Sequence, residues 1–152
     1  MSPWDGRKVV VCVGTGGVGK TTTAAALAIA AAAAGRRTLV MTIDPARRLA
    51  NAMGIAEIGN LEREIPSERL AAYGVQLKAP LFAMMPDVKR TFDDLVRRTA
   101  PNPEARDRIL NSRIYEYFST SLVGSHEYAA VEKLYEVYAS GAYDLIVLDT
   151  PP

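Results

Sequence analysis

The feature of this sequence that most limits its fold is a glycine-dense stretch, Gly14 to Gly19, between an apolar run and an alanine-rich run. The preceding residues, Lys8–Val13, are β-branched and apolar without alternation, which predicts a strand covered on both faces. The following Lys20–Ala34 is rich in strong helix formers, and Gly35 can end that helix. The glycines are therefore expected to form a loop between a buried strand and a helix.

Two further apolar runs predict more strands of the same sheet. Thr38–Ile43 follows the predicted helix, and Leu145–Asp149 lies near the end of the chain. Strand, helix and strand in quick succession form a βαβ unit, which has parallel strands. We therefore predict an α/β fold with a mostly parallel sheet flanked by helices. Residues 70–77 are a weaker candidate for a third strand, because Gly74 interrupts them.

The middle of the chain is predicted to be helical. Val88, Phe92 and Val96 recur at helical spacing, and Pro103 suits the first turn of a further helix, which we expect to run to about residue 118. Another helix carries an apolar stripe that we expect to face the core, with an interaction surface as the alternative. Its members are Tyr128, Val131, Leu134, Tyr135 and Tyr138.

Composition and charge exclude several classes of protein. The 152 residues suffice for one compact domain, and the net charge of +1 provides no broad field for nucleic acid or an anionic membrane. The one cysteine, Cys12, cannot form an internal disulfide or a thiolate cluster, and we expect it in the core. The N-terminus lacks a signal-peptide pattern, and the alanine run is shorter than the roughly 20 residues that span a bilayer. We therefore expect a cytoplasmic protein without an integral membrane segment or a nucleic acid partner.

The glycine-dense stretch also matches a phosphate-binding pattern, G-x-x-x-x-G-K-[ST], over Gly14–Thr21. Glycines let successive amides converge on phosphate oxygens, and the helix start adds its positive dipole end. Lys20 supplies a cation for the outer phosphates, and the Thr21 hydroxyl is a hard oxygen ligand for Mg²⁺. A glycine-rich turn without a ligand is the alternative, which the position between strand and helix disfavours. The residues predicted to bind the nucleotide are Gly14, Thr15, Gly16, Gly17, Val18, Gly19, Lys20, Thr21 and Thr22.

Two aspartates end predicted strands and are candidate ligands for Mg²⁺ or its water. Asp149 closes an apolar strand, which is the Walker B pattern, although a helix cap or a turn would also explain it. Asp44 follows the second strand and would face the same edge of the sheet, because parallel strands end together there. An Asp-Pro turn explains Asp44 equally well.

Three segments together, Gly14–Thr23, Asp44–Ala46 and Asp149–Pro151, resemble the ArsA-type ATPases. This family contains arsenite-pump ATPases and the ATPases that target tail-anchored membrane proteins, within the P-loop ATPases of the deviant Walker A type. The resemblance implies a P-loop NTPase fold with a helical insertion, here residues 82–140, before the Walker B strand. It also implies that ATP and Mg²⁺ bind between the two nucleotide domains of a homodimer or heterodimer. Hydrolysis would then move the helical part, with a hydrophobic client protein as a further expected partner.

Two positions depart from the family pattern. The family loop carries a lysine after its first glycine, where this chain has Thr15, and an aspartate that polarises the attacking water is matched here by Asn51. Threonine carries no charge, and an amide can orient water but cannot accept its proton. We predict an ATPase with Lys20, Asp44 and Asn51 as its catalytic residues. The alternative is a nucleotide-binding regulatory subunit that hydrolyses weakly or not at all and needs a heteromeric partner.

The predicted domain covers residues 1–152, and we expect it to be truncated, because doubly wound sheets usually continue beyond a strand such as Leu145–Asp149. A soft metalloid would require several thiolates. Since Cys12 is the single cysteine of the chain, we do not expect an arsenite site here.

Overall fold

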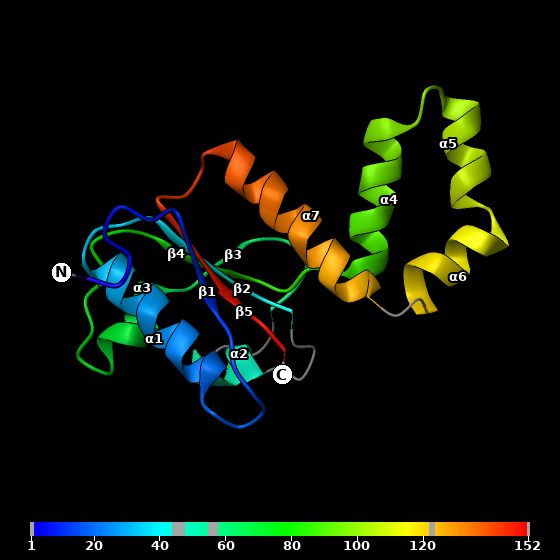
Figure 1. Ribbon diagram of the computed structural model, residues 1–152. Coiled ribbons are helices and arrows are strands. Elements are labelled where there is room, and N and C mark those ends of the chain that lie inside the picture. Colours follow the sequence, from blue (N-terminus) through cyan, green and yellow to red (C-terminus); the bar gives the residue numbers. More distant parts are fainter. Residues whose placement is uncertain (1, 44–47, 55–57, 122–123, 152) are drawn as a thin grey trace. The chain divides into compact units, whose positions relative to one another are not determined.

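The computed structural model describes residues 2–43, 48–54, 58–121 and 124–151. The chain forms two compact units (Figure 1). The first comprises Met1–Met85 and Val137–Pro152 and contains the sheet, and the second, Pro86–Glu136, is helical.

The first unit is built on a sheet of five strands in its described part, in the order β1-β5-β2-β4-β3. Neighbouring strands are parallel, except that β3 and β4 are antiparallel. This arrangement confirms the predicted α/β fold with a mostly parallel sheet. The strands are β1 (Val9–Cys12), β2 (Thr38–Thr42), β3 (Arg63–Glu64), β4 (Leu81–Met84) and β5 (Leu145–Asp149).

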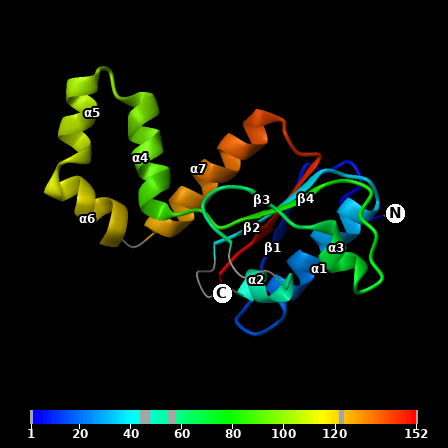
Figure 2. The ribbon, with the colours of Figure 1, turned by 180° about the vertical axis from the view of Figure 1, so that it is seen from behind.

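Three helices of this unit lie on one side of the sheet (Figures 1 and 2). The longest, α1 (Lys20–Ala33), packs on β2 and β5 and buries a row of alanines, whose small side chains allow the helix close to the strands. The short helix α2 (Arg48–Ala52) packs on α1, and α3 (Ser67–Ala71) contributes Leu70 to the same core.

The end of α1 shows the predicted glycine cap. Gly35 has a φ of 97°, and the Arg36 amide donates to the Ala31 carbonyl at 3.0 Å. This pattern is the Schellman motif, in which a left-handed residue closes the last turn. The Arg36 guanidinium then donates to the carbonyls of Trp4 and Arg7, both at 2.8 Å, so it ties the N-terminal segment to the start of β2.

Two strand predictions need correction. The predicted third strand at residues 70–77 is wrong, because Ser67–Ala71 is helical and Gly74 turns the chain with a φ of 78°. The strand forms later, at Leu81–Met84, where three of the four side chains are buried. The apolar run around β1 is also less covered than expected, with Val11 46% exposed, because β1 is an edge strand of the sheet.

The helical unit contains α4 (Val88–Thr99), α5 (Pro103–Leu110), α6 (Arg113–Ser121) and the larger part of α7 (Ser125–Ser140). Asp87 caps α4 by accepting from the Arg90 amide at 2.7 Å. Asn102 caps α5 in the same way, and Pro103 occupies its first turn as predicted. The predicted single helix from Pro103 to about residue 118 is wrong, because α5 ends at Leu110 and α6 is a separate helix.

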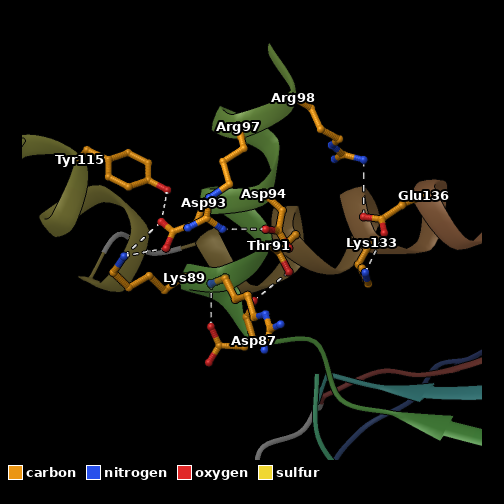
Figure 3. A network of polar contacts seen from close by, with 11 residues as sticks. Asp87, Lys89, Thr91, Asp93, Asp94, Arg97, Arg98, Tyr115, Lys133 and Glu136 are labelled. Carbon is orange, nitrogen blue, oxygen red and sulfur yellow. Dashed lines mark hydrogen bonds and ion pairs between the residues drawn. The ribbon is translucent and has the colours of Figure 1, made fainter. Parts of the chain in front are cut away.

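Charged and hydroxyl side chains connect these helices (Figure 3). Asp93 on α4 accepts from the Tyr115 hydroxyl of α6 at 2.7 Å and from Lys89 at 3.0 Å. At the other end of α4, Arg98 forms ion pairs with Glu132 at 2.8 Å and Glu136 at 3.5 Å on α7. The polar contacts therefore join α4 to α6 and to α7.

The prediction that the tyrosine-rich stripe of α7 faces the core is wrong. Tyr128, Val131 and Tyr135 are exposed, the last at 67%, whereas Ala129 and Ala130 are buried. The helix therefore buries its small side chains and exposes its large apolar ones.

Strand β4 (Leu81–Met84) includes residues 82–84, so the first residues of the predicted insertion belong to the sheet.

None of the helices in the described ranges combines the length and apolarity that a bilayer crossing requires.

We predict that Tyr115→Phe lowers the free energy of unfolding by about 1 kcal/mol, the net value of one hydrogen bond. Burial, and next the hydrogen bond to Asp93, raises the pKa of Tyr115 above its usual range. The stabilisation is therefore complete below about pH 10 and decreases as the pH rises toward the higher pKa of the folded state. Urea unfolding of the parent and the variant between neutral and alkaline pH measures both effects.

Tyr117→Phe is the matched control, because Tyr117 is on the same helix and its side chain is 65% exposed. Equal losses in the two variants would contradict the role given to the Tyr115 hydroxyl.

Candidate functional site

The glycine-dense loop lies where the sequence places it, between the end of β1 and the start of α1. Gly17 and Gly19 have φ values of 78° and 90°, a region that costs other residues roughly 1–2 kcal/mol. A turn of this kind directs successive amides into a concave arrangement that suits anions. In both ribbon views the loop lies at the same end of the sheet as the end of β5 (Figures 1 and 2).

The N-terminus of α1 begins at a glycine. Gly19 occupies the cap position, no side-chain cap bond forms there in the described ranges, and the first turn contains no acidic residue. The first amides of an α-helix have no partner within the helix, and the helix dipole makes them attractive to negative charge. Thr21 is half-buried and Thr22 is exposed, and both belong to the first turn of α1, directly after the loop.

Lys20 folds back onto the loop that precedes it. Its Nζ donates to the Thr15 carbonyl at 2.8 Å. The cation is therefore held at the loop by one bond to the backbone, which a stronger acceptor such as a phosphate oxygen could replace. The side chain of Thr15 is exposed and uncharged, so it supplies no second cation at this position.

Asp149 is fully buried at the end of β5. Its Oδ2 accepts from the Thr42 hydroxyl at 3.1 Å, whereas its Oδ1 has no hydrogen-bond partner among the described residues. An orphaned buried carboxylate oxygen is costly and is rare in native proteins. It is a suitable ligand for a cation or for a water that the cation holds.

Neighbouring strands fix the backbone around this carboxylate. The Ile43 amide donates to the Asp149 carbonyl at 3.2 Å, and the Thr150 hydroxyl donates to the Cys12 carbonyl at 2.8 Å.

The Cys12 thiol is buried, and burial, followed by the charge of Asp149, raises its pKa. A thiol that stays protonated is a poor nucleophile and a poor metal ligand, which agrees with the predicted core role of Cys12.

The sequence predicts Asp44 and Asn51 as catalytic residues, and the structure describes only the second of them. Asp44 lies outside the described residues, so its proposed roles in catalysis and metal binding stay predictions. Asn51 is exposed on α2 and lines a cavity of about 650 Å³, together with Arg69 and Leu70 of α3 and with Tyr73, which follows that helix. Its expected action on the attacking water likewise stays a prediction.

The described side chains do not form a conventional metal cluster. No group of three or more histidine, cysteine, aspartate or glutamate residues lies together in the ranges that the structure covers. A magnesium ion at this edge would therefore depend on a hydroxyl, a carboxylate and oxygens of its nucleotide, which is the usual way Mg²⁺ binds at phosphates.

Thr42 is a residue of this site that the sequence analysis did not single out. It is the last residue of β2, and its hydroxyl donates to the carboxylate of Asp149. The available signal was a threonine at the end of an apolar strand, directly before the Ile43-Asp44-Pro45 segment. The pattern alone does not reveal which neighbouring strand the hydroxyl faces.

Comparisons with known proteins agree with this geometry. Residues 7–152 match the model of the anion-transporting ATPase family. "Putative arsenical pump-driving ATPase 1" of Aquifex aeolicus is 24% identical over 149 residues, covering 95% of this chain and 35% of that protein. An uncharacterized protein of Streptomyces coelicolor is 30% identical, covering 95% of this chain and 34% of its own length. "Putative arsenical pump-driving ATPase" of Chlorobaculum tepidum is 28% identical, covering 95% and 33%. The chain thus spans about a third of the length of the curated relatives it matches.

We predict that Gly17→Ala weakens binding of a polyphosphate about tenfold. Alanine disfavours the left-handed backbone by roughly 1–2 kcal/mol, which would move the loop amides away from their shared focus. Titration with a fluorescent ATP analogue measures the affinity.

Gly59→Ala is the control, because Gly59 lacks a left-handed φ and an added methyl group would meet nothing within 4 Å. A loss of affinity in Gly59→Ala that equals the loss in Gly17→Ala would contradict the role of the loop conformation.

Proposed function

Because the chain belongs to the anion-transporting ATPase family, we propose that it binds ATP with Mg²⁺ at Gly14–Thr22 and hydrolyses the nucleotide. The observation that carries the proposal is the left-handed glycine loop that joins the end of β1 to the uncapped N-terminus of α1. This arrangement supplies many short N–H donors to a dense anion. The family membership agrees with the resemblance found in the sequence, and the preference for ATP rests on it.

In the proposed complex, the loop amides and the first turn of α1 hold the phosphate oxygens. Lys20 exchanges its bond to the Thr15 carbonyl for the outer phosphates, which are stronger acceptors because they are charged. The two family departures, Thr15 and Asn51, remove a cation and a carboxylate from the proposed machinery. Binding is therefore better supported by the residues present than turnover.

The residues that would hold magnesium are Thr21 and Asp149, with Asp44 as the further predicted ligand. The buried Oδ1 of Asp149 fits this role, because it has no partner in the described ranges. Magnesium, when bound, would neutralise charge on the β- and γ-phosphates. The protein then has to orient one water for in-line attack, for which Asn51 is the predicted residue.

The proposed assembly is a dimer, either homomeric or heteromeric, in which two nucleotide domains face each other with ATP between them. A partner subunit could supply the cation that Thr15 does not provide. The exposed apolar side chains of the helical unit support a protein partner, for which a hydrophobic client is the predicted candidate. These side chains are Ile114, Tyr117, Phe118, Tyr128, Val131 and Tyr135.

Lys20→Ala is expected to weaken ATP binding about ten- to hundredfold, because a hydrogen bond to a charged group contributes roughly 1.5–3 kcal/mol. Lys78→Ala is the matched control. Lys78 is an exposed lysine whose backbone amide contacts the C-terminal end of α1, at Ala32. Affinity is measured with a fluorescent ATP analogue, and an unchanged affinity in Lys20→Ala would contradict the proposed function.

Single-turnover hydrolysis distinguishes an ATPase from the regulatory subunit that is the alternative. An ATPase is expected to cleave bound ATP faster than ATP reacts in buffer containing magnesium. Clear binding with no acceleration would favour the regulatory subunit, because Thr15 and Asn51 replace the two groups that stabilise charge and polarise water.

A further inference from the structure

The two oxygens of the buried Asp149 carboxylate have different environments. Oδ2 accepts the Thr42 hydroxyl at 3.1 Å, and Oδ1 has no partner among the described residues. Because the side chain is fully buried, water does not replace the missing partner at the surface. Oδ2 is therefore hydrogen-bonded within the protein, and Oδ1 is available to a ligand.

The sheet register places these two side chains side by side. Thr42 and Asp149 are Cα partners of the parallel β2–β5 pair, so their side chains point to the same face. Val40 and Val147, two positions earlier, are also partners and belong to the core that the alanines of α1 enter. By alternation, Thr42 and Asp149 face the side of the sheet on which α1 packs.

The Thr42 side chain is well suited to hold a fixed direction. It is β-branched, which restricts its χ1 angle, and it is 2% exposed in a strand with every residue buried. The Ile43 amide also binds the Asp149 carbonyl at 3.2 Å, so both the backbone and the side chain of Asp149 are held by the end of β2. The orientation of the carboxylate is therefore set by β2 as well as by its own strand.

We propose that Thr42 is a positioning residue for magnesium at the nucleotide site. Its hydroxyl holds Oδ2 of Asp149, and this bond directs Oδ1 to the ion or to the water that the ion carries. Thr42 touches neither the nucleotide nor the metal in this scheme and acts through the carboxylate. The inference rests on the proposed function, since it assigns Asp149 to the magnesium of that same site.

The test is the magnesium dependence of nucleotide binding. Thr42→Val keeps the shape and removes the donor. It is expected to raise the Mg²⁺ concentration for half-maximal binding of a fluorescent ATP analogue about tenfold or more, as loss of an outer-shell partner does. Binding of the analogue without magnesium is expected to stay unchanged, and Thr42→Ser to restore the magnesium response.

Thr38→Val is the control within the same strand. Thr38 is as deeply buried as Thr42, but its hydroxyl donates to the Arg36 carbonyl at 2.8 Å at the opposite end of β2. It is expected to leave the magnesium response unchanged. If valine at position 42 prevents folding, Thr42→Cys keeps a weak donor at the buried position, and a smaller shift in the same direction is expected.

The outcomes separate the two proposals. A parent chain that binds the analogue with magnesium, combined with an unshifted Thr42→Val, overturns the positioning role alone. Equal shifts in Thr38→Val and Thr42→Val overturn it as well, because they show a general effect of losing a buried hydroxyl. A parent chain that does not bind the analogue overturns the proposed function and this inference with it.

Discussion

The structure depends most on the parallel register of β1, β5 and β2. This register aligns Cys12, Asp149 and Thr42 as Cα partners at the carboxyl ends of adjacent strands. Since α1 starts directly after the loop that follows β1, the same edge also receives the helix N-terminus and the glycine turn. A buried carboxylate, a lysine and a set of backbone amides are thereby brought to one edge of the sheet by main-chain hydrogen bonds.

The exposed glycine loop is supported by a tightly packed core of the sheet and α1. The alanines of α1 contact the sheet closely, and β2 and β5 are buried along their whole lengths. The loop itself, Gly14–Gly19, is exposed. A rigid support under an open, backbone-lined turn is a general requirement for binding a small anion, because the ligand then orders few groups of the protein.

In the helical unit, unlike in the buried strands β2 and β5, many large apolar side chains are exposed. Its helices are joined by aromatic contacts such as Phe92 stacked on Tyr128, with ring centroids 5.6 Å apart, and by the polar contacts of Asp93 and Arg98. Tyr128 is exposed on its other side, and Ile114 is 83% exposed. Within this unit several large apolar side chains are therefore exposed rather than packed.

Features that depend on local pattern could be predicted from the amino-acid sequence. The glycine loop, the strands at Thr38–Thr42 and Leu145–Asp149, the cap at Gly35 and the family all follow from short motifs, because backbone geometry and phosphate chemistry allow few residue types there. Features that depend on neighbours distant in sequence became visible in the folded structure. It placed the third parallel strand at Leu81–Met84 and turned the α7 tyrosines outward, since periodicity gives a helix an apolar face without saying what covers it. It also paired Thr42 with Asp149 across 107 positions, because strand register, which no local pattern encodes, brings the two side chains together.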